Sequence, residues 1–519
     1  MTFLVGIDCG TTSIKACVYN ETGQMVNLVK TDTITHYKDN FSWYEPEEIW
    51  EKIIYVIKCV LDGIDKKNIA GISVTSFGEA GVPIDKNGNP TYPIISWFNL
   101  CSLPQAKLLK NTIGKEQIFK ITGLDANPIF SLPKLLWLKE NEPESFSRTY
   151  KWLCLTDYIY YKLTGEMRTD YTIASRTMAL DINKCCWSDE LLAAVGLSVE
   201  LFPRLIQSGK KVGTITVSTA KCTSLPTGTP VIAGGHDHFC GSIASGVLLG
   251  NRVLDSSGTA ESIHALIKEK NELMNTYKGF RIGRFLNPEY FYIVGGLVSS
   301  GITVDWIIDR CASISDWTIN SEETTDKKYY YGDVMKLVEK TKPGADGLIF
   351  IPHLRGSGAP YWDPHSKGTF IGLKSLHSSP MMIRAVIEGL CFDVRMIVEE
   401  MTKIIGHKID TLTVIGGGAK NNFWQQVKAN ITGIPVEVPD VEEATAMGAA
   451  LLAGVGVGIY EDIKTASCKT YKKKKRYEPK FADRELYNEL YSIYKQVYPA
   501  LKPINIKIDN LFDNRRYKK

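Results

Sequence analysis

A glycine-containing turn near the N-terminus has the residue types that phosphate and a divalent metal ion require. An apolar run ends in Asp8, and period-two alternation resumes after the turn, which predicts a β-hairpin. Glycine lets the backbone approach a ligand, and turn amides and hydroxyls can donate to anionic oxygens. Asp8 suits Mg²⁺, held through water because this ion dehydrates reluctantly. An unliganded polar turn is the alternative. The turn residues are Gly10, Thr11, Thr12 and Ser13.

A second turn of the same kind lies far downstream, at Ser257-Gly258-Thr259. It joins a short apolar strand from Arg252 to another that resumes at Ser262. Two such hairpins suggest a duplicated architecture with nucleotide bound between the halves, where small-molecule sites usually form. The sequence contains no GxxxxGK[ST] motif, so a P-loop is not expected.

A carboxylate between two histidines precedes the second hairpin. The apolar run Pro230–Ala233 leads through two glycines into His236-Asp237-His238, and small residues suited to a helix start follow. Asp237 at such a strand end is well placed as a general base. The histidines could bind a metal, but an H-x-H pair alone is weak support for that, and substrate contacts or hydrogen-bonded loop histidines are favoured.

A third glycine turn follows the buried strand that begins near Val414. Gly417 and Gly418 precede Asn421, and a helix is expected from there onward. Glycines allow the backbone to pack against a base or phosphate, and a helix N-terminus favours anions. A plain strand-to-helix turn explains the segment equally well.

The composition is that of an ordinary globular protein of 519 residues, with 44% hydrophobic and 23% charged residues, and two or more domains are expected. A net charge of +4 does not suggest a nucleic-acid partner, and the basic run Lys472–Arg476 is interpreted as a solvated loop or strand edge. No signal peptide or membrane-spanning run is recognised, which predicts a cytoplasmic protein with no membrane partner. The cysteines lack metal-ligand spacing and are expected to be reduced.

Together these segments resemble the FGGY family of carbohydrate kinases, and the similarity extends over essentially the whole chain. Ile129 and Met381 depart from the family signatures at peripheral positions. Ser357 replaces a usual Glu, so the role of that carboxylate is not carried over. The other family-like stretches are Phe130–Asn141, Leu155–Tyr158, Leu163–Gly165, Thr169–Tyr171, Leu354–Pro364, Gly368–Leu373, Ala385–Glu388 and Glu443–Ala450.

The resemblance implies an α/β fold of two ribonuclease-H/actin-like domains with a nucleotide and sugar cleft between them. The implied division is residues 1–245 for sugar binding, 246–482 for nucleotide binding, and 483–519 for a C-terminal helix and tail. Tyrosines at spacings of four, three and four predict one packed helix face, and the last dozen residues are expected to be loosely held. These tyrosines are Tyr487, Tyr491, Tyr494 and Tyr498.

The resemblance also implies ATP and Mg²⁺ as cofactors. Asp8 would hold Mg²⁺, and Asp237 would accept the proton of the attacking sugar hydroxyl. Phosphoryl transfer needs charge neutralisation and alignment more than covalent chemistry. The small-residue helix after Glu443 is expected to serve close packing. The implied nucleotide contacts are Gly10, Thr11, Thr12, Ser13, Lys15, Gly258, Thr259, Gly301, Gly417, Gly418 and Asn421.

The implied sugar loop departs from the family's better-known patterns. Glu79 is expected to accept hydrogen bonds from sugar hydroxyls, although a solvated loop carboxylate is the alternative. Trp97 could form a wall or simply pack. With no Arg cluster in this loop, a neutral acceptor is expected, with pentuloses and other short ketoses favoured. The candidate sugar contacts are Phe77, Gly78, Glu79, Trp97, Asn99, His236, Asp237 and His238.

Other functions remain open at this stage. A kinase of a polyol or aldonate, such as glycerol, erythritol or gluconate, would use the same chemistry. An actin-like ATPase switch shares the two hairpins but lacks the sugar-kinase signatures, and a silent sugar-binding regulator would not need both Asp8 and Asp237. No GxGxxG follows the first strand, which disfavours a dehydrogenase. A homodimer is compatible with the sequence, which does not fix the oligomeric state.

Overall fold

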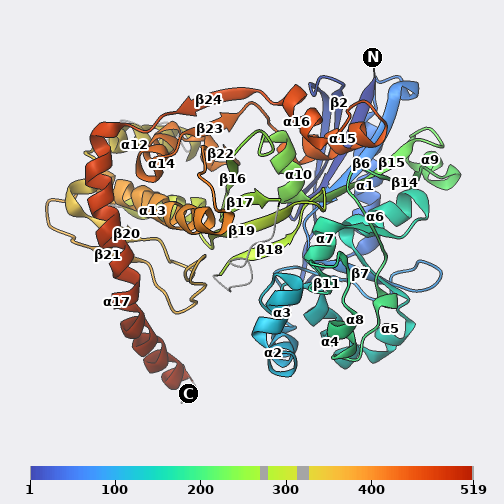
Figure 1. Cartoon of the computed structure of the whole chain (residues 1–519), viewed down its shortest axis with the longest axis horizontal. Helices are drawn as coiled ribbons and strands as arrows, with labels where there is room; N and C mark the ends of the chain where they lie inside the picture. The colour runs from blue at the N-terminus through green and yellow to red at the C-terminus, as the bar shows by residue number, and fades with distance from the viewer. Residues whose placement is uncertain (1, 269–278, 313–326, 517–519) are drawn as a thin grey trace.

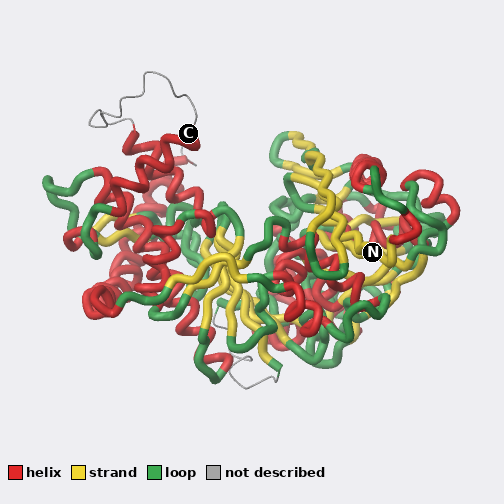
Figure 2. Tube along the Cα trace, turned by 90° about the horizontal axis from the view of Figure 1, so that it is seen from above, coloured by secondary structure: helices red, strands yellow, loops and turns green. Residues whose placement is uncertain are grey.

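The computed structural model describes residues 2–268, 279–312 and 327–516. Two lobes lie side by side, each built around a mixed β-sheet with helices packed against it (Figure 1). From above, the strands of the C-terminal lobe lie on its side toward the other lobe, and most of its helices lie on the far side (Figure 2). The predicted α/β architecture is confirmed.

The N-terminal lobe contains a six-stranded sheet in the order β14-β15-β6-β1-β2-β3. In this sheet β1, β6 and β15 are parallel, whereas the other pairs are antiparallel. Because the carboxyl ends of parallel strands share one edge, residues that follow β1, β6 and β15 come together there. The bounds are β14 Lys211–Thr214, β15 Pro230–His236, β6 Ile69–Ser76, β1 Phe3–Cys9, β2 Ser13–Asn20 and β3 Met25–Asp32.

The C-terminal lobe contains a seven-stranded sheet in the order β18-β19-β17-β16-β22-β23-β24. Here β16, β22 and β23 are parallel. The basic run predicted as a strand edge forms the exposed edge strand β24, where lysines discourage pairing with other chains. The bounds are β18 Arg281–Arg284, β19 Phe291–Leu297, β17 Glu261–Ile267, β16 Arg252–Ser257, β22 Thr411–Ile415, β23 Val436–Pro439 and β24 Lys473–Tyr477.

Strand β1 is buried on both faces because a helix covers each one. Val5 and Ile7 join a core with α1 (Pro46–Val60), whereas Leu4 on the other face joins a core with α15 (Ala444–Gly456). The near-continuous apolar character of β1 follows from this double coverage. Further helices that position the site are α4 Ser131–Asn141, α6 Leu155–Thr164, α7 Tyr171–Ser175, α10 Asp237–Ala244, α11 Gly301–Ala312, α13 Ser379–Ile405, α14 Asn422–Thr432, α16 Ile463–Thr470 and α17 Arg484–Arg516.

The small residues of α15 allow close packing, as predicted. A Cβ on Gly6 would overlap the carbonyl oxygen of Ala446, and one on Gly448 would overlap that of Cys240. This helix lies on the first sheet although it comes late in the chain, beside the N-terminal strands in Figure 1. The division at residue 245 therefore stays a proposal, with α15 crossing back to the N-terminal lobe.

The predicted tyrosine face of the C-terminal helix is confirmed. The four side chains of α17 are buried, and Phe392 of α13 lies against three of the rings. Their hydroxyls donate to carboxylates of the C-terminal lobe, so the face is amphipathic rather than purely apolar. The acceptors are Glu388 for Tyr487, Glu399 for Tyr491, Asp393 for Tyr494 and Asp363 for Tyr498.

The segment predicted as a loosely held tail is helical up to Arg516, which the prediction did not include. Helix α17 continues to Arg516 and projects from the lobe (Figure 1). Asp509 accepts hydrogen bonds from the side chains of His365 and Lys367 at 2.7 and 3.1 Å. These contacts over more than a hundred residues of chain are not visible as a local pattern. The last three residues lie outside the described part.

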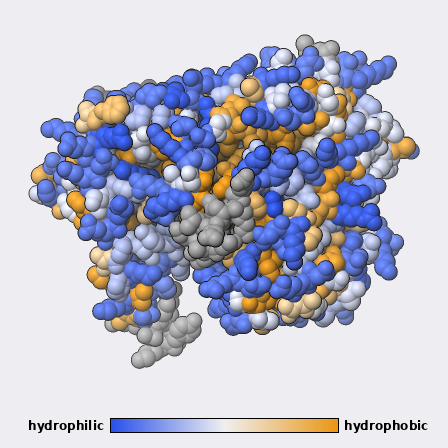
Figure 3. All heavy atoms as spheres, viewed as in Figure 1, coloured by the Kyte–Doolittle hydropathy of each residue, from blue (hydrophilic) through white to orange (hydrophobic). Residues whose placement is uncertain are grey.

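Among the described residues, every helix is too short or too polar to cross a bilayer. The face in Figure 3 is largely hydrophilic, with apolar residues gathered between the two lobes.

Replacing Tyr494 by Phe should lower the stability of the C-terminal lobe. The Tyr494 hydroxyl donates to Asp393 at 2.7 Å, and removing it leaves a buried carboxylate oxygen without this donor. Such a loss costs about 1–3 kcal/mol. Urea unfolding should show an earlier midpoint, whereas Tyr55→Phe, at a side chain 53% exposed, should leave it unchanged. Equal midpoints for the two variants would contradict the assigned role.

Candidate active site

The first predicted phosphate turn is present and lies at the carboxyl edge of the N-terminal sheet. Strands β1 and β2 form the predicted hairpin, in which Asp8 pairs with Lys15 across the strands. The Gly10 amide donates to the Ser13 carbonyl at 3.0 Å, which closes the turn. Thr11 is half-buried and Thr12 is exposed, so their hydroxyls are available to a ligand.

Asp8 lies in an environment that opposes its ionisation. Burial raises its pKa to about 7, and the neighbouring charge of Asp237 adds to this rise, while Lys15 opposes it. A bound cation would relieve both effects. Oxygen donors are the ligands that Mg²⁺ prefers, so Asp8 fits the metal role predicted for it.

Lys15 is held by an acidic partner that sequence reasoning did not identify. Its ammonium group lies 2.5 Å from Glu443 Oε2 at the start of α15. Both side chains are partly exposed, at 19% and 22%. Glu443 offsets part of the charge of Lys15, and burial and Asp237 raise the pKa of Asp8 more than Lys15 lowers it. A cation bound beside Asp8 would therefore stabilise its ionised form.

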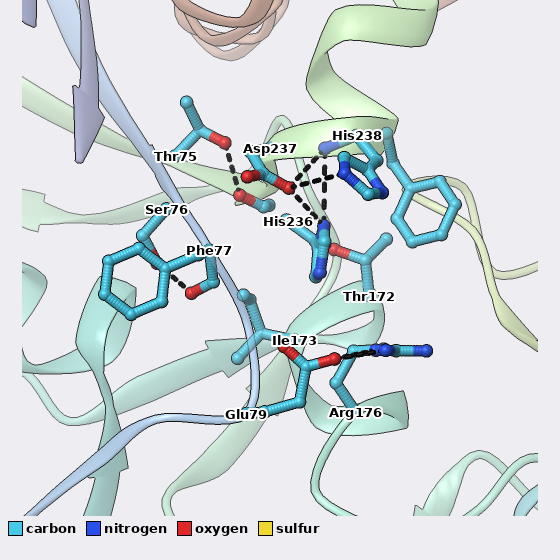
Figure 4. Close-up of polar contacts among 12 residues, drawn as sticks. Thr75, Ser76, Phe77, Glu79, Thr172, Ile173, Arg176, His236, Asp237 and His238 are labelled. Atoms are coloured by element: carbon cyan, nitrogen blue, oxygen red, sulfur yellow. Dashed lines mark hydrogen bonds and ion pairs between the residues drawn. The ribbon is translucent and has the colours of Figure 1, made fainter. Parts of the chain in front are cut away.

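Asp237 is the first residue of α10, directly after β15. Parallel pairing aligns Asp8 with Thr75 and Thr75 with Gly235, which brings Asp237 to the same sheet edge. The Thr75 hydroxyl donates to the Gly235 carbonyl at 2.7 Å and fixes this edge. The sequence prediction of a strand-end carboxylate is confirmed, and Figure 4 shows Asp237 beside both histidines.

The histidines keep Asp237 ionised. Its Oδ1 lies 2.7 Å from His236 Nδ1 and accepts from the His238 amide at 2.6 Å. Burial opposes ionisation, but the charges of His236 and His238 hold the pKa of Asp237 below its usual value. The contacts use Oδ1, which leaves Oδ2 as the oxygen that can accept a proton.

The same three side chains can also present a metal-binding donor set. Their ligand atoms lie within 4.8 Å of one another. Two imidazoles and one carboxylate suit a zinc-type ion better than Mg²⁺. Asp237 and His236 already contact each other directly, an arrangement that also suits a base and its hydrogen-bonding partner.

Glu79 is close to this group but is not a free carboxylate. It is buried, adopts a left-handed backbone conformation with φ of 68°, and is bound by Arg176, whose Nε lies 2.6 Å from Oε1. Despite burial, the Arg176 charge holds the pKa of Glu79 below its usual value. Figure 4 shows the pair near His236. A non-glycine residue held at positive φ is typical of a functional site.

Sequence reasoning missed both basic residues that support Glu79. Arg176 follows α7, and Lys134 lies within α4 in a stretch recognised only as a family signature. The Lys134 ammonium donates to the carbonyls of Glu79, Trp97 and Ile129 at 3.2, 3.4 and 2.7 Å. Burial lowers its pKa to about 7. Lys134 thus ties together three loops around the predicted sugar site.

The remaining predicted sugar contacts differ in their surroundings. Gly78 is required for packing, because a Cβ there would lie 2.7 Å from His236 Cδ2. Phe77 is buried with its ring 5.5 Å from that of Tyr44, and Trp97 is half-buried against the core. These positions favour walls of the site rather than polar contacts.

The prediction that Asn99 contacts the sugar is corrected by the structure. Its side chain is 2% exposed, donates to the Ser42 carbonyl at 3.1 Å and accepts from the Cys101 amide at 2.8 Å. Asn side chains commonly bond the backbone two residues on, and this local turn uses the amide.

The second hairpin contacts the third glycine turn, residues 416–421, in the C-terminal lobe; this turn is named the base loop, after the nucleotide base. A Cβ on Gly416, which has φ of 90°, would lie 2.5 Å from the Ser257 carbonyl oxygen, and one on Gly418 would overlap Ser257 Oγ. The Gly301 amide donates to the Gly258 carbonyl at 2.9 Å. The predicted nucleotide segments therefore form one surface, on which Gly258, Thr259 and Gly417 are at least partly exposed.

Asn421 has a structural role in this surface. Its side chain caps α14 by accepting from the Trp424 amide at 3.0 Å and donates to Tyr331 Oη at 3.0 Å. The predicted contact between this side chain and the nucleotide would compete with these bonds. Its cap instead directs the N-terminus of α14 toward the base loop.

Asp8→Asn should stabilise the metal-free protein at neutral and alkaline pH. The folded protein keeps a proton on Asp8 up to about pH 7, whereas the ordinary pKa is 3.8. Stability is therefore lost as pH rises through this window, and Asn removes the loss, by about 1–4 kcal/mol at pH 8. Thermal unfolding in EDTA should show this gain at pH 8 and a vanishing gain near pH 4. The exposed control Asp440→Asn should show neither, and an unstabilised Asp8→Asn protein would refute the assignment.

Comparison with known proteins agrees with this geometry. The N- and C-terminal domains of the FGGY family of carbohydrate kinases match residues 3–244 and 256–457. Xylulose kinase from Bacillus subtilis is 29% identical over 99% of this chain and 100% of its own length. L-fuculokinase from Escherichia coli strain K12 is 31% identical over 87% of this chain and 92% of its own.

A solved structure of the same kind also superposes over the whole molecule. Ligand-bound xylulose kinase from Lactobacillus acidophilus matches with a TM-score of 0.87 and 25% identity, covering 98% of this chain and 100% of the other. The predicted two-domain actin-like and ribonuclease-H-like fold is thereby confirmed, and the enzyme class is a phosphotransferase. The chain belongs to the FGGY family of carbohydrate kinases.

Proposed function

We propose that this protein transfers the γ-phosphoryl group of ATP to a hydroxyl of a small neutral sugar, with a pentulose such as xylulose as the first candidate. The observation that carries the proposal is the position of Asp237 at the same sheet edge as Asp8, with its contacts to both histidines made through Oδ1 alone. The xylulose kinase relatives support the substrate class.

The residues divide the chemistry between the two hairpins. Turn amides and hydroxyls at Gly10–Ser13 and Gly258–Thr259 would bind the phosphates. Asp8 would hold Mg²⁺, which supplies neutralisation of phosphate charge when bound. Asp237 Oδ2 would accept the proton as the sugar oxygen attacks phosphorus in line and ADP leaves. Closure of the lobes would exclude water, which competes as an acceptor.

The charges near Glu79 favour a neutral acceptor. Arg176 is already paired with Glu79, whose charge offsets its own, so the pair attracts the carboxylate of an aldonate less than an unpaired arginine would. The oxygen of Glu79 that Arg176 does not bind would accept from sugar hydroxyls. The hydroxyls of a polyol could donate to Glu79 in the same way. An ATPase that does not depend on a sugar would have no use for the Glu79–Arg176 pair.

Asp237→Asn should abolish sugar-dependent ADP release while leaving ATP binding intact. A placed general base contributes about 10²–10⁴-fold in rate. A coupled assay measures kcat, and calorimetry measures the Kd for ATP. Retention of more than about a tenth of the wild-type rate would overturn the assignment, because a loss of less than tenfold is far smaller than the contribution of a general base. Asp440→Asn makes the same change of charge at an exposed side chain and should retain full activity.

Glu79→Gln should reduce kcat/KM for the preferred sugar by about tenfold or more, which corresponds to about 1.4 kcal/mol of lost binding in the transition state. The KM for ATP should not change, because Glu79 binds Arg176 rather than a residue of either phosphate turn. Glu48→Gln, at a side chain 39% exposed, is the control. An unchanged kcat/KM across ketoses, polyols and aldonates would remove Glu79 from the sugar site.

A further inference from the structure

A lysine in the C-terminal lobe is fully buried together with two carboxylates. Lys428, on α14, has a side chain with 0% exposure, as do Asp255 and Glu261. Its ammonium group donates to Asp255 Oδ2 and lies 2.6 Å from Glu261 Oε1. Burying these charges is costly, and replacing such a group by apolar residues is often neutral or stabilising. Stability alone therefore does not explain why the group is present.

The two carboxylates belong to the arms of the second phosphate hairpin. Asp255 lies on β16 and Glu261 is the first residue of β17, on either side of the Gly258–Thr259 turn. Both strands are thus fixed to one ammonium group just below the turn. Any change in the separation of Asp255 and Glu261 would alter the hairpin tip.

Glu261 also connects the group to Ser300 and Gly301, at the start of α11. Its Oε2 accepts from the Ser300 hydroxyl at 2.5 Å. The backbone of the same segment joins the turn, because the Ser300 amide donates to the Thr259 carbonyl and the Gly301 amide to the Gly258 carbonyl, each at 2.9 Å. The start of α11 is therefore held to the same center as the hairpin.

The helix that carries Lys428 also carries the base loop. Helix α14 begins after Asn421, and Gln425 on the same helix donates from Nε2 to the Gly418 carbonyl at 2.8 Å. The base loop in turn lies directly against Ser257 of the hairpin. One short helix thus fixes the base loop at its N-terminus and the hairpin through Lys428.

The charged groups of Lys428, Asp255 and Glu261 pair with one another inside the lobe. Burial, reinforced by Glu261, raises the pKa of Asp255 well above its usual value. Burial opposes ionisation of Glu261 too, but Lys428 lowers the pKa of that carboxyl below its usual value. All three side chains are fully buried, so none of them can contact a bound nucleotide directly. The group therefore acts on the nucleotide through geometry.

We propose that Lys428 is a positioning residue for the nucleotide, which holds the second phosphate hairpin, the start of α11 and the base loop in one arrangement. This inference rests on the proposed use of ATP. Misplacement of binding groups by about 1 Å can cost up to a hundredfold in rate. Loss of Lys428 should therefore affect the nucleotide while leaving the sugar loop, in the other lobe, unchanged.

The test compares Lys428→Met with Arg252→Met. Arg252 lies on the same strand as Asp255 but at its far end, where it pairs with Glu437 at 2.6 Å. Both variants lose a cation that pairs with a carboxylate of this sheet, and thermal unfolding should register a loss of stability for each. Only Lys428→Met should raise the Kd and KM for ATP, by about tenfold to a hundredfold, with the KM for sugar within twofold of wild type. An unchanged KM for ATP in a folded Lys428→Met protein, or an equal rise in Arg252→Met, would overturn the proposal.

A milder variant covers the case in which Lys428→Met does not fold. Glu261→Gln keeps the shape of the side chain and should raise the KM for ATP several-fold without changing the KM for sugar. A wild-type KM for ATP in Glu261→Gln would then refute the positioning role. The wild-type protein is assayed first with ATP and sugar. No turnover there would count against the proposed function, whereas the difference between variants in ATP binding tests Lys428 separately.

Discussion

The structure depends on two carboxylates held close together at one edge of a parallel sheet. Strands β1 and β15 flank β6, so Asp8 and Asp237 meet there whatever ligand is present. Two neighbouring carboxylates with different surroundings acquire different proton affinities. Burial and Asp237 raise the pKa of Asp8, whereas the histidines lower that of Asp237. Asp8 is therefore suited to bind a cation. Asp237 stays ionised and can itself accept a proton.

The C-terminal lobe complements this edge with surfaces made by close backbone approach. Gly416, Gly418 and Gly301 permit contacts that a Cβ would prevent, and they bring the base loop, the second hairpin and the start of α11 together. A buried lysine with two carboxylates lies beneath them. The small residues of α15 likewise allow this helix to pack closely against the N-terminal sheet. In the proposed mechanism the base and the metal ligand belong to the N-terminal lobe, whereas the phosphate turns come from both lobes.

Local patterns predicted much of this arrangement, but partnerships over long distances did not show in the sequence. Strand, turn and strand are encoded within a few residues, which is why both hairpins and the strand-end position of Asp237 were predictable. Glu443 is 428 residues from Lys15, and Arg176 is 97 from Glu79, so only folding pairs them. Asn99 was misassigned because a local turn uses its amide. The contacts of Asp509 near the C-terminal end of α17 were not predicted because its partners are distant in the sequence.

The most direct test of the central claim follows the phosphorus atom. The protein is incubated with ATP, Mg²⁺ and D-xylulose, and the products are recorded by ³¹P NMR spectroscopy, with other ketoses and polyols in parallel. If the protein is a carbohydrate kinase with Asp237 as its base, a sugar-phosphate resonance should grow in step with ADP. The Asp237→Asn variant should not produce it. Release of inorganic phosphate in step with ADP, unaffected by any sugar, would contradict the account.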